Sequence, residues 1–146
     1  MADPVKVVCI CGSLRKKSFN AALARQAQTL APPGMSIAAA PPLDAIPLYN
    51  HDVQESDGFP APVSELAAAI RAADGVLICS PEYNWSIPGV LKNAIDWVSR
   101  MKDQPFAMKP VALQGRRSNQ PGTPDEKMGA VFTYSQRPVS NLPARI

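Results

Sequence analysis

The sequence predicts an α/β fold in which helices cover both faces of a parallel sheet. Short β-branched or apolar runs alternate with segments whose apolar residues recur at helical spacing, and turns rich in glycine or proline separate them. Such an alternation requires crossover connections between parallel strands. Because ligands of these sheets bind beyond the carboxyl ends of the strands, the loops that follow the strands are the first candidates for a site.

Four strands are expected, at residues 5–10, 35–39, 76–79 and 110–114, with helices at 19–30, 63–70 and 91–101. The turn at residues 32–34, with two prolines and a glycine, ends the first helix. Residues 40–62 are expected to be mostly irregular, because prolines interrupt any long helix or central strand there. These prolines are Pro41, Pro42, Pro47, Pro60 and Pro62.

Size and composition set further bounds. A chain of 146 residues fits one domain, and 46% hydrophobic residues exclude general disorder. We expect no membrane span, because no apolar run reaches about 18 residues. The N-terminus has no secretory leader, which predicts a cytoplasmic protein. The net charge of +3 is spread out, so no nucleic-acid partner is expected and a small anionic ligand fits better.

Cysteine and histidine are too few for a disulfide framework or a metal set. The chain has three cysteines, Cys9, Cys11 and Cys79, and one histidine, His51. We interpret the cysteines as reduced, buried thiols and expect no metal site.

The loop after the first strand, Gly12–Asn20, has the groups of a phosphate site. Its glycine permits a tight turn, and the helix that begins near Ser18 directs backbone N–H groups and the positive end of its dipole into the same space. The loop matches neither a dinucleotide-binding glycine motif nor a Walker loop. The alternative is a polar loop whose Ser18 only caps the helix. The polar groups offered to an anion are those of Ser13, Arg15, Ser18 and Asn20.

The loop after the third strand, Ser80–Gly89, is too specialised for a simple connection. Two prolines stiffen it, and Tyr83 and Trp85 offer flat apolar faces. Backbone amides and Asn84 are suited to the polar edge of a flat heterocycle. The alternative is that the two aromatic residues cap the core and that residues 87–89 only start the next helix.

Together the two loops resemble those of the NAD(P)H-dependent FMN reductase family, in particular bacterial quinone and chromate reductases and related azoreductases. The resemblance runs from about residue 5 to Gln114. Its most specific part is one long string after the third strand. The matching segments are Gly12-Ser13-Leu14-Arg15, Ser18-Phe19-Asn20, Ile46-Pro47-Leu48-Tyr49-Asn50, Pro81-Glu82-Tyr83-Asn84, Ser86, Pro88-Gly89 and Leu91-Lys92-Asn93-Ala94-Ile95-Asp96-Trp97.

The resemblance implies a flavodoxin-like three-layer α-β-α sandwich that binds FMN noncovalently. The loop at Ser13–Asn20 would hold the phosphate, and Pro81–Asn84 would hold the isoalloxazine ring. The implied cofactor-binding residues are Ser13, Leu14, Arg15, Ser18, Phe19, Asn20, Pro81, Glu82, Tyr83, Asn84, Arg117 and Ser118.

The implied reaction is ping-pong hydride transfer. NADPH or NADH would reduce the flavin, and a quinone, free flavin, azo compound or metal oxyanion would then take the electrons. The flavin carries the chemistry, so no catalytic side chain is assigned and Glu82 is expected to have a positioning role or a salt bridge. The resemblance also implies a homodimer or homotetramer.

The resemblance implies a flavodoxin-like domain at residues 1–114 and an atypical tail at 115–146, with the last strand and helix truncated or altered. Residues 129–134 have the composition of a short strand, and Arg117 and Ser118 fall where the family's last flavin-contacting loop would lie. Two alternatives to the enzyme stay open. One is an FMN-binding electron carrier without NAD(P)H activity, and the other is an inactive, truncated flavoprotein.

Overall fold

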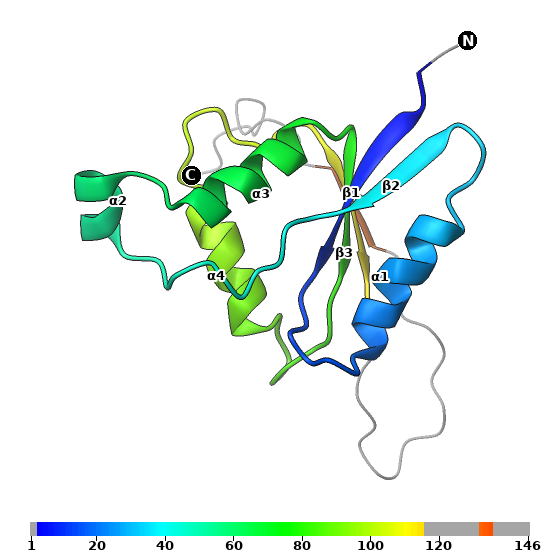
Figure 1. Cartoon of the computed structure of the whole chain (residues 1–146), viewed down its shortest axis with the longest axis horizontal. Helices are drawn as coiled ribbons and strands as arrows, with labels where there is room; N and C mark the ends of the chain where they lie inside the picture. Colours follow the sequence, from blue (N-terminus) through cyan, green and yellow to red (C-terminus); the bar gives the residue numbers. More distant parts are fainter. Residues whose placement is uncertain (1–2, 116–131, 136–146) are drawn as a thin grey trace, which may run out of the picture.

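The computed structural model describes residues 3–115 and 132–135, and its ribbon is shown in Figure 1. No helix among these residues is long and apolar enough to cross a membrane. The elements in chain order are β1 (Val5–Cys11), α1 (Phe19–Thr29), β2 (Met35–Ala39), α2 (His51–Asp57), α3 (Ala61–Arg71), β3 (Gly75–Cys79), α4 (Gly89–Val98), β4 (Pro110–Gln114) and β5 (Phe132–Ser135).

The strands form one sheet in the order β2-β1-β3-β4-β5. The first four are parallel, which confirms the predicted α/β class. In register, Val7 of β1 lies opposite Ile37 of β2 and Gly75 of β3. β1 therefore lies inside the sheet, with β2 on one side of it and β3, β4 and β5 on the other.

The fifth strand departs from the prediction of a parallel sheet. β5 pairs antiparallel with β4, with Leu113 opposite Phe132. An antiparallel neighbour, unlike a parallel one, does not require a crossover helix. The rest of the predicted strand at 129–134, residues 129–131, lies outside the described residues.

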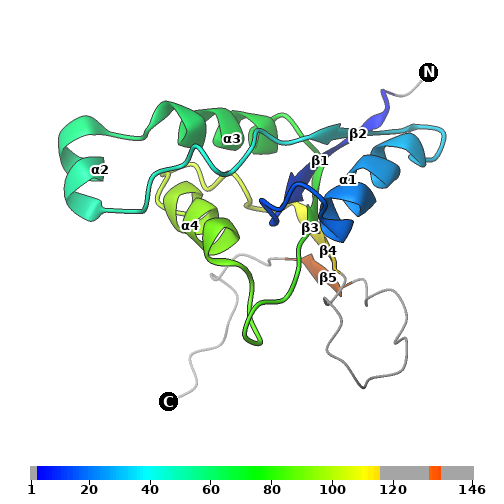
Figure 2. The ribbon, with the colours of Figure 1, turned by 60° about the horizontal axis from the view of Figure 1, so that its bottom comes forward.

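Helices cover both faces of the sheet because successive strand residues point to opposite sides. Figures 1 and 2 show α1 on one face and α3 and α4 on the other. Ala24 of α1 packs with Cys9 and Cys79. The larger core lies on the opposite face, and its members from the two central strands are Val8, Ile10, Val76 and Ile78.

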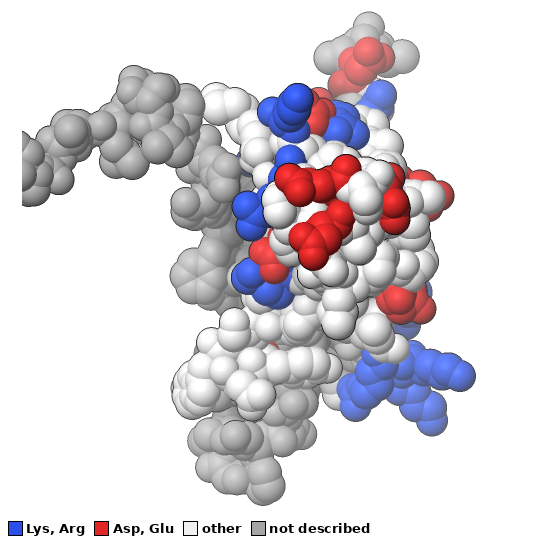
Figure 3. All heavy atoms as spheres, turned by 90° about the vertical axis from the view of Figure 1, so that its left-hand side faces the viewer, with Lys and Arg blue, Asp and Glu red and all other residues white. Residues whose placement is uncertain are grey.

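Residues 40–62 are mostly irregular, as predicted, and the exception is the short helix α2. This short helix fits between Pro47 and Pro60, so neither proline interrupts it. The Asn50 side chain caps it by accepting a hydrogen bond from the Asp52 amide at 2.9 Å. Acidic side chains gather over the α2 end of the molecule in Figure 3, where α2 contributes Asp52, Glu55 and Asp57, all exposed.

The long segment before α2 is held against α4 by two buried side chains. Asn93 accepts a hydrogen bond from the Tyr49 amide at 2.8 Å and donates one to the Pro47 carbonyl at 2.9 Å. The Trp97 indole N–H also donates to the Pro47 carbonyl, at 2.8 Å. The Tyr49 ring packs edge-on against Trp97, with centroids 5.0 Å apart. These contacts give Asn93 and Trp97 a structural role.

Removing the Asn93 amide is predicted to destabilise the fold. Asn93→Ala leaves the Tyr49 amide without its acceptor, and we expect it to lower the free energy of unfolding by about 2 kcal/mol. Lys92→Ala is the matched control, because it removes only an exposed ion pair with Asp96 and is expected to cost less than about 0.5 kcal/mol. Urea denaturation followed by circular dichroism measures both. Equal losses would contradict the assigned role.

Candidate functional site

The two loops singled out in the sequence begin side by side. β1 and β3 are neighbours, with Cys11 opposite Cys79 at their carboxyl ends. The Gly12 amide continues the ladder by donating to the Cys79 carbonyl at 2.9 Å. Both loops lie at the lower end of the sheet in Figure 1, after which the chain passes to α1 on one face and to α4 on the other. This divergence makes the β1/β3 edge the topological switch point of the sheet.

The approach of the loops depends on two glycines around Ser80. A Cβ on Gly12 would lie 2.9 Å from the Ser80 Cβ and closer still to its hydroxyl. A Cβ on Gly115, just after β4, would overlap the Ser80 backbone carbonyl. The Ser80 amide in turn donates to the Gln114 carbonyl at 2.9 Å. Three strand ends therefore converge on one buried serine, and only glycine fits at two of them.

The loop after β1 ends in a capped helix. The buried Ser18 hydroxyl oxygen accepts from the amides of Asn20 at 3.2 Å and Ala21 at 3.3 Å. Ser18 therefore caps α1. Capping uses the lone pairs of this oxygen, so the hydroxyl hydrogen can still be donated to an anion. Ser13, one residue beyond Gly12, is half-buried.

The same loop has a positive, exposed surface. Arg15, Lys16 and Lys17 are all exposed and precede the N-terminus of α1, whose dipole is positive at that end. The Arg15 guanidinium carbon lies 5.8 Å from the centroid of the Phe19 ring. Leu14 is more than half exposed, as is Phe19. Of the residues assigned to phosphate binding, Ser18 and Asn20 are buried, Ser13 is half-buried, and Leu14, Arg15 and Phe19 face solvent.

The loop after β3 contains a tight two-residue turn. Tyr83 and Ser86 exchange backbone hydrogen bonds of 2.8 and 3.0 Å. Between them Asn84 has a φ of 49° and Trp85 a φ of 63°. Left-handed backbone at both central positions is the pattern of a type I′ turn, which favours Asn followed by Gly. Trp85 in place of glycine costs roughly 1–2 kcal/mol.

The aromatic residues of this turn point away from the core. Tyr83 is 49% exposed and Trp85 is 83% exposed, so the alternative in which they cap the core is wrong. Pro81 is buried at the base of the loop, whereas Glu82 and Asn84 are exposed. The exposed end of this loop is therefore polar and aromatic, whereas its first residues are buried. Arg117 and Ser118 lie outside the described residues.

The cysteines lie on the two central strands just before the loops, Cys9 and Cys11 on β1 and Cys79 on β3. The Cys9 and Cys79 sulfur atoms are 3.9 Å apart and buried, and Cys11 is half-buried. The Cys9 thiol donates toward Cys79, and this contact together with burial raises the pKa of Cys9 above that of an ordinary thiol. In residues 3–115 no cluster of three or more possible ligands is placed to hold a metal ion. Cys9 and Cys79 are buried, as expected, whereas Cys11 is only half-buried.

The segment that resembles the family includes Tyr49 and Asn50, and the next residue, His51, begins α2. Two of them have structural roles here, since Tyr49 packs on Trp97 and Asn50 caps α2. His51 is exposed on α2, with its Nε2 atom 3.3 Å from a Glu55 carboxylate oxygen. Ser80 and Gly115 were missed as site residues. Both could have been found from the sequence, because Ser80 directly follows the strand β3 and Gly115 directly follows the strand β4.

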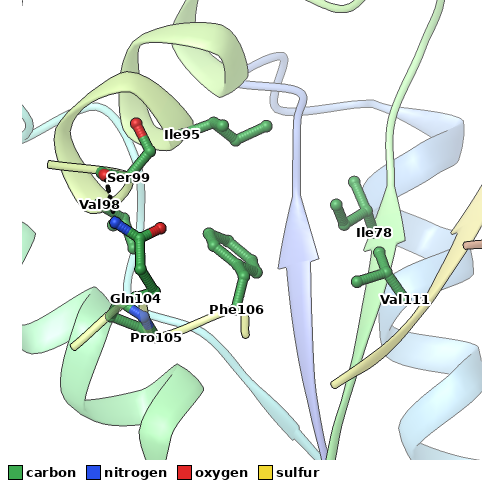
Figure 4. A pocket seen from close by; sticks show the side chains of 8 residues that line it. All are labelled: Ile78, Ile95, Val98, Ser99, Gln104, Pro105, Phe106 and Val111. Carbon is green, nitrogen blue, oxygen red and sulfur yellow. Dashed lines mark hydrogen bonds between the residues drawn. The ribbon is translucent and has the colours of Figure 1, made fainter. Parts of the chain in front are cut away.

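A cavity of about 230 Å³ lies between α4 and the sheet, away from the loops. Figure 4 shows Ile95, Phe106 and Val111 pointing into it. The polar residues Gln104 and Ser99 are joined by a hydrogen bond of 2.9 Å. No residue of the two loops lines it, and its apolar walls do not suit an anion. The lining residues are Ile78, Ile95, Val98, Ser99, Gln104, Pro105, Phe106 and Val111.

Comparison with known proteins places this arrangement in one family. Residues 5–141 match the family described as NADPH-dependent FMN reductase, so the match continues past Gln114. The chain is 55% identical to a quinone reductase of Escherichia coli K12 over 114 residues, covering 78% of this chain and 61% of that protein. It is 51% identical to an NAD(P)H-dependent FMN reductase of Pseudomonas aeruginosa over 123 residues, covering 84% and 65%. The chain thus spans less than two thirds of these relatives.

Solved structures agree with the fold. The flavoenzyme NAD(P)H:(acceptor) oxidoreductase FerB from Paracoccus denitrificans superimposes with a TM-score of 0.68 at 38% identity, over 76% of this chain and 60% of that one. An azoreductase from Bacillus anthracis superimposes with a TM-score of 0.52 at 20% identity, over 83% and 73%, and supports the fold alone. The flavodoxin-like α/β class is therefore confirmed.

Adding a side chain at Gly12 is predicted to disturb the loops. Gly12→Ala forces its new Cβ against Ser80, and we expect the free energy of unfolding to fall by about 1–3 kcal/mol. Gly89→Ala is the matched control, because its Cβ meets nothing within 4 Å and its effect should stay within about 0.5 kcal/mol. Urea denaturation of both variants provides the test. If Gly12→Ala is as stable as Gly89→Ala, the close approach of the two loops is wrong.

Proposed function

The chain belongs to the NADPH-dependent FMN reductase family, and on that premise we propose that it binds FMN and passes electrons from NADPH or NADH to a quinone-type acceptor. The observation that carries the proposal is the meeting of the two loops at the β1/β3 switch point, joined by the Gly12–Cys79 hydrogen bond. In open α/β sheets of this strand order, this edge is where a flavin mononucleotide binds.

The residues at this edge fit a phosphate. The hydroxyls of Ser13 and Ser18 can each donate one hydrogen bond, and Arg15 supplies a planar cation suited to bidentate contact. Because Gly12 has no Cβ, the backbone can approach the ligand closely. The N-terminus of α1, an eleven-residue helix, adds its positive end. These groups would hold the FMN phosphate.

The loop after β3 fits a flat ring. The two hydrogen bonds between Tyr83 and Ser86 hold the backbone of its tip, and the Asn84 side chain and neighbouring amides would contact the ring. The half-exposed Tyr83 ring would border the isoalloxazine face, and buried Pro81 would set the base of the loop. A rigid turn reduces the entropy lost on binding. Glu82 would act by position and not as an acid or base.

The overall reaction is NAD(P)H plus a quinone and one proton, giving NAD(P)+ and the hydroquinone. Bound FMN would supply the redox chemistry, taking a hydride from the nicotinamide and passing two electrons to the acceptor. The protein's residues would bind and orient the reactants, and the one proton would come from solvent. Because both substrates use the same flavin, the kinetics are expected to be ping-pong.

The proposal also includes further electron acceptors and an oligomeric assembly. Free flavin, azo compounds and metal oxyanions are further candidate acceptors, and a homodimer or homotetramer is the expected assembly. An FMN-binding electron carrier is less well supported, because the relatives named above are reductases and oxidoreductases and the net charge of +3 does not suit a carrier. Bound flavin without oxidation of NADPH or NADH in the presence of a quinone would favour the carrier.

The assignment of the phosphate loop predicts a selective effect of Arg15. Arg15→Ala should weaken FMN binding about tenfold, the value of one charge-assisted hydrogen bond, and should leave riboflavin binding unchanged. Arg25→Ala is the matched control, since Arg25 is an exposed residue of α1 beyond its first turn. Quenching of flavin fluorescence measures both ligands. Equal loss of FMN and riboflavin affinity in Arg15→Ala would contradict phosphate binding by this loop.

A further inference from the structure

Ser80 is the buried residue at which the strand β3 passes into the loop that follows it. Only 6% of its surface is exposed. Its amide donates to the Gln114 carbonyl at 2.9 Å, which extends the pairing of β3 with β4 by one step. Its side chain lies against Gly12, where a Cβ would come within 2.9 Å of the Ser80 Cβ. Ser80 therefore contacts both neighbouring strand ends, and the sheet positions its hydroxyl.

The Ser80 hydroxyl donates a hydrogen bond to the carbonyl of the next residue. Its Oγ atom lies 3.1 Å from the Pro81 carbonyl oxygen, and the bond is buried. Pro81 is itself buried, so its carbonyl turns inward at the base of the loop. The peptide that carries this carbonyl joins Pro81 to Glu82, the first exposed residue of the loop. A hydrogen bond inside the protein thus orients the peptide from which the exposed part of the loop starts.

Proline makes the orientation of this peptide depend on a single dihedral angle. The pyrrolidine ring sets φ of Pro81 near about −65°, so the direction of its carbonyl is determined by ψ alone. The extended and helical conformations that share this φ have ψ near about +145° and about −42°, which is a difference of half a turn. They direct the carbonyl to opposite sides of the chain. The hydrogen bond from Ser80 stabilises the arrangement in which the carbonyl faces the core.

The planarity of the peptide then determines what the loop presents on its outer side. No peptide bond among the described residues is cis, and in a trans peptide the C=O and N–H groups point in opposite directions. Because the Pro81 carbonyl turns towards Ser80, the N–H edge of the same peptide, at Glu82, points out of the core. The polar edge of a flavin ring carries oxygen and nitrogen atoms that accept hydrogen bonds. A carbonyl would repel these atoms, whereas an N–H edge attracts them.

We propose that Ser80 is a positioning residue for the flavin ring. Its hydroxyl holds the Pro81–Glu82 peptide so that the N–H edge of this peptide, and not its carbonyl, faces the ring. The inference rests on the proposed function, since it places the isoalloxazine at the loop after β3. Ser80 acts through the peptide and not by contact with the cofactor. Its effect is therefore specific to the ring, in contrast to that of Arg15, which concerns the phosphate.

The central test measures ring binding and phosphate binding separately on the full chain. Without the hydroxyl the peptide samples both arrangements, and the apparent affinity for the ring falls with the fraction of molecules in the competent one. Ser80→Ala should therefore weaken riboflavin and FMN by the same factor, about fivefold. It should change the affinity for inorganic phosphate by less than about twofold. Quenching of flavin fluorescence measures the two flavins, and the amide chemical shifts of residues 12–20 measure phosphate.

Two further variants separate the hydroxyl from the substitution itself. Ser80→Thr keeps the hydroxyl and should stay within about twofold of the unsubstituted chain for all three ligands. Ser99→Ala is the matched control, because the Ser99 hydroxyl also donates to a main-chain carbonyl, that of Asp96 at 2.9 Å. Ser99 caps the far end of α4 and lines the apolar cavity, so its removal should change none of the three affinities.

A second measurement needs no ligand. In the unliganded chain, the 13C shift of the Pro81 carbonyl reports the hydrogen bond from Ser80, and the 15N shift of the Glu82 amide reports the orientation of the same peptide. Both shifts should move in Ser80→Ala and return towards their original values in Ser80→Thr. An unchanged Pro81 carbonyl shift in Ser80→Ala would overturn the assigned role, because the hydrogen bond would then not orient the peptide.

The binding outcomes separate this inference from the proposed function. If the unsubstituted chain binds neither FMN nor riboflavin, the proposed function is wrong, and the positioning role with it. If the chain binds both and Ser80→Ala leaves the riboflavin affinity unchanged, the positioning role alone is overturned. An equal loss of phosphate and riboflavin affinity in Ser80→Ala would also overturn it, because the substitution would then disturb the contact with Gly12 that both loops share.

Discussion

The hydrogen bond from the Gly12 amide to the Cys79 carbonyl is the contact on which the candidate site depends. It extends the β1/β3 ladder by one step and starts two loops at the same point. Around it, Ser80 lies so close to Gly12 and Gly115 that neither position tolerates a Cβ. A site for one ligand requires groups from several strands within a few ångströms. Close backbone packing supplies that proximity here, and the side chains then determine the chemistry.

The two loops use this shared origin in different ways. The loop after β1 ends in a helix whose N-cap, Ser18, is buried, and it places exposed cations next to that cap. The loop after β3 turns back on itself through Asn84 and Trp85, both with left-handed backbone. One loop is therefore suited to a charged group and the other to a flat ring. FMN has both, which is why the pair is more informative than either loop alone.

The strands and the loops that follow them could be predicted because their signals are local. Residues 5–10 and 76–79 are apolar runs that end in polar loops, and the family resemblance identified those loops. Helix α2 was missed because the five prolines around it suggested irregular structure, although they only bound it. The roles of Ser80 and Gly115 depend on contacts between distant residues, which no local pattern contains. The exposure of Trp85 was likewise invisible, because an aromatic residue between prolines is equally compatible with core packing.

The central claim is that FMN binds where β1 and β3 end, and not in the apolar cavity between α4 and the sheet. The most direct measurement is an FMN titration of the 15N-labelled chain followed by the chemical shifts of its backbone amides. The account predicts the largest shifts at residues 12–20 and 82–86, with small changes around the cavity. Shifts concentrated at Ile95, Phe106 and Val111, which line that cavity, with none in the two loops, would contradict it.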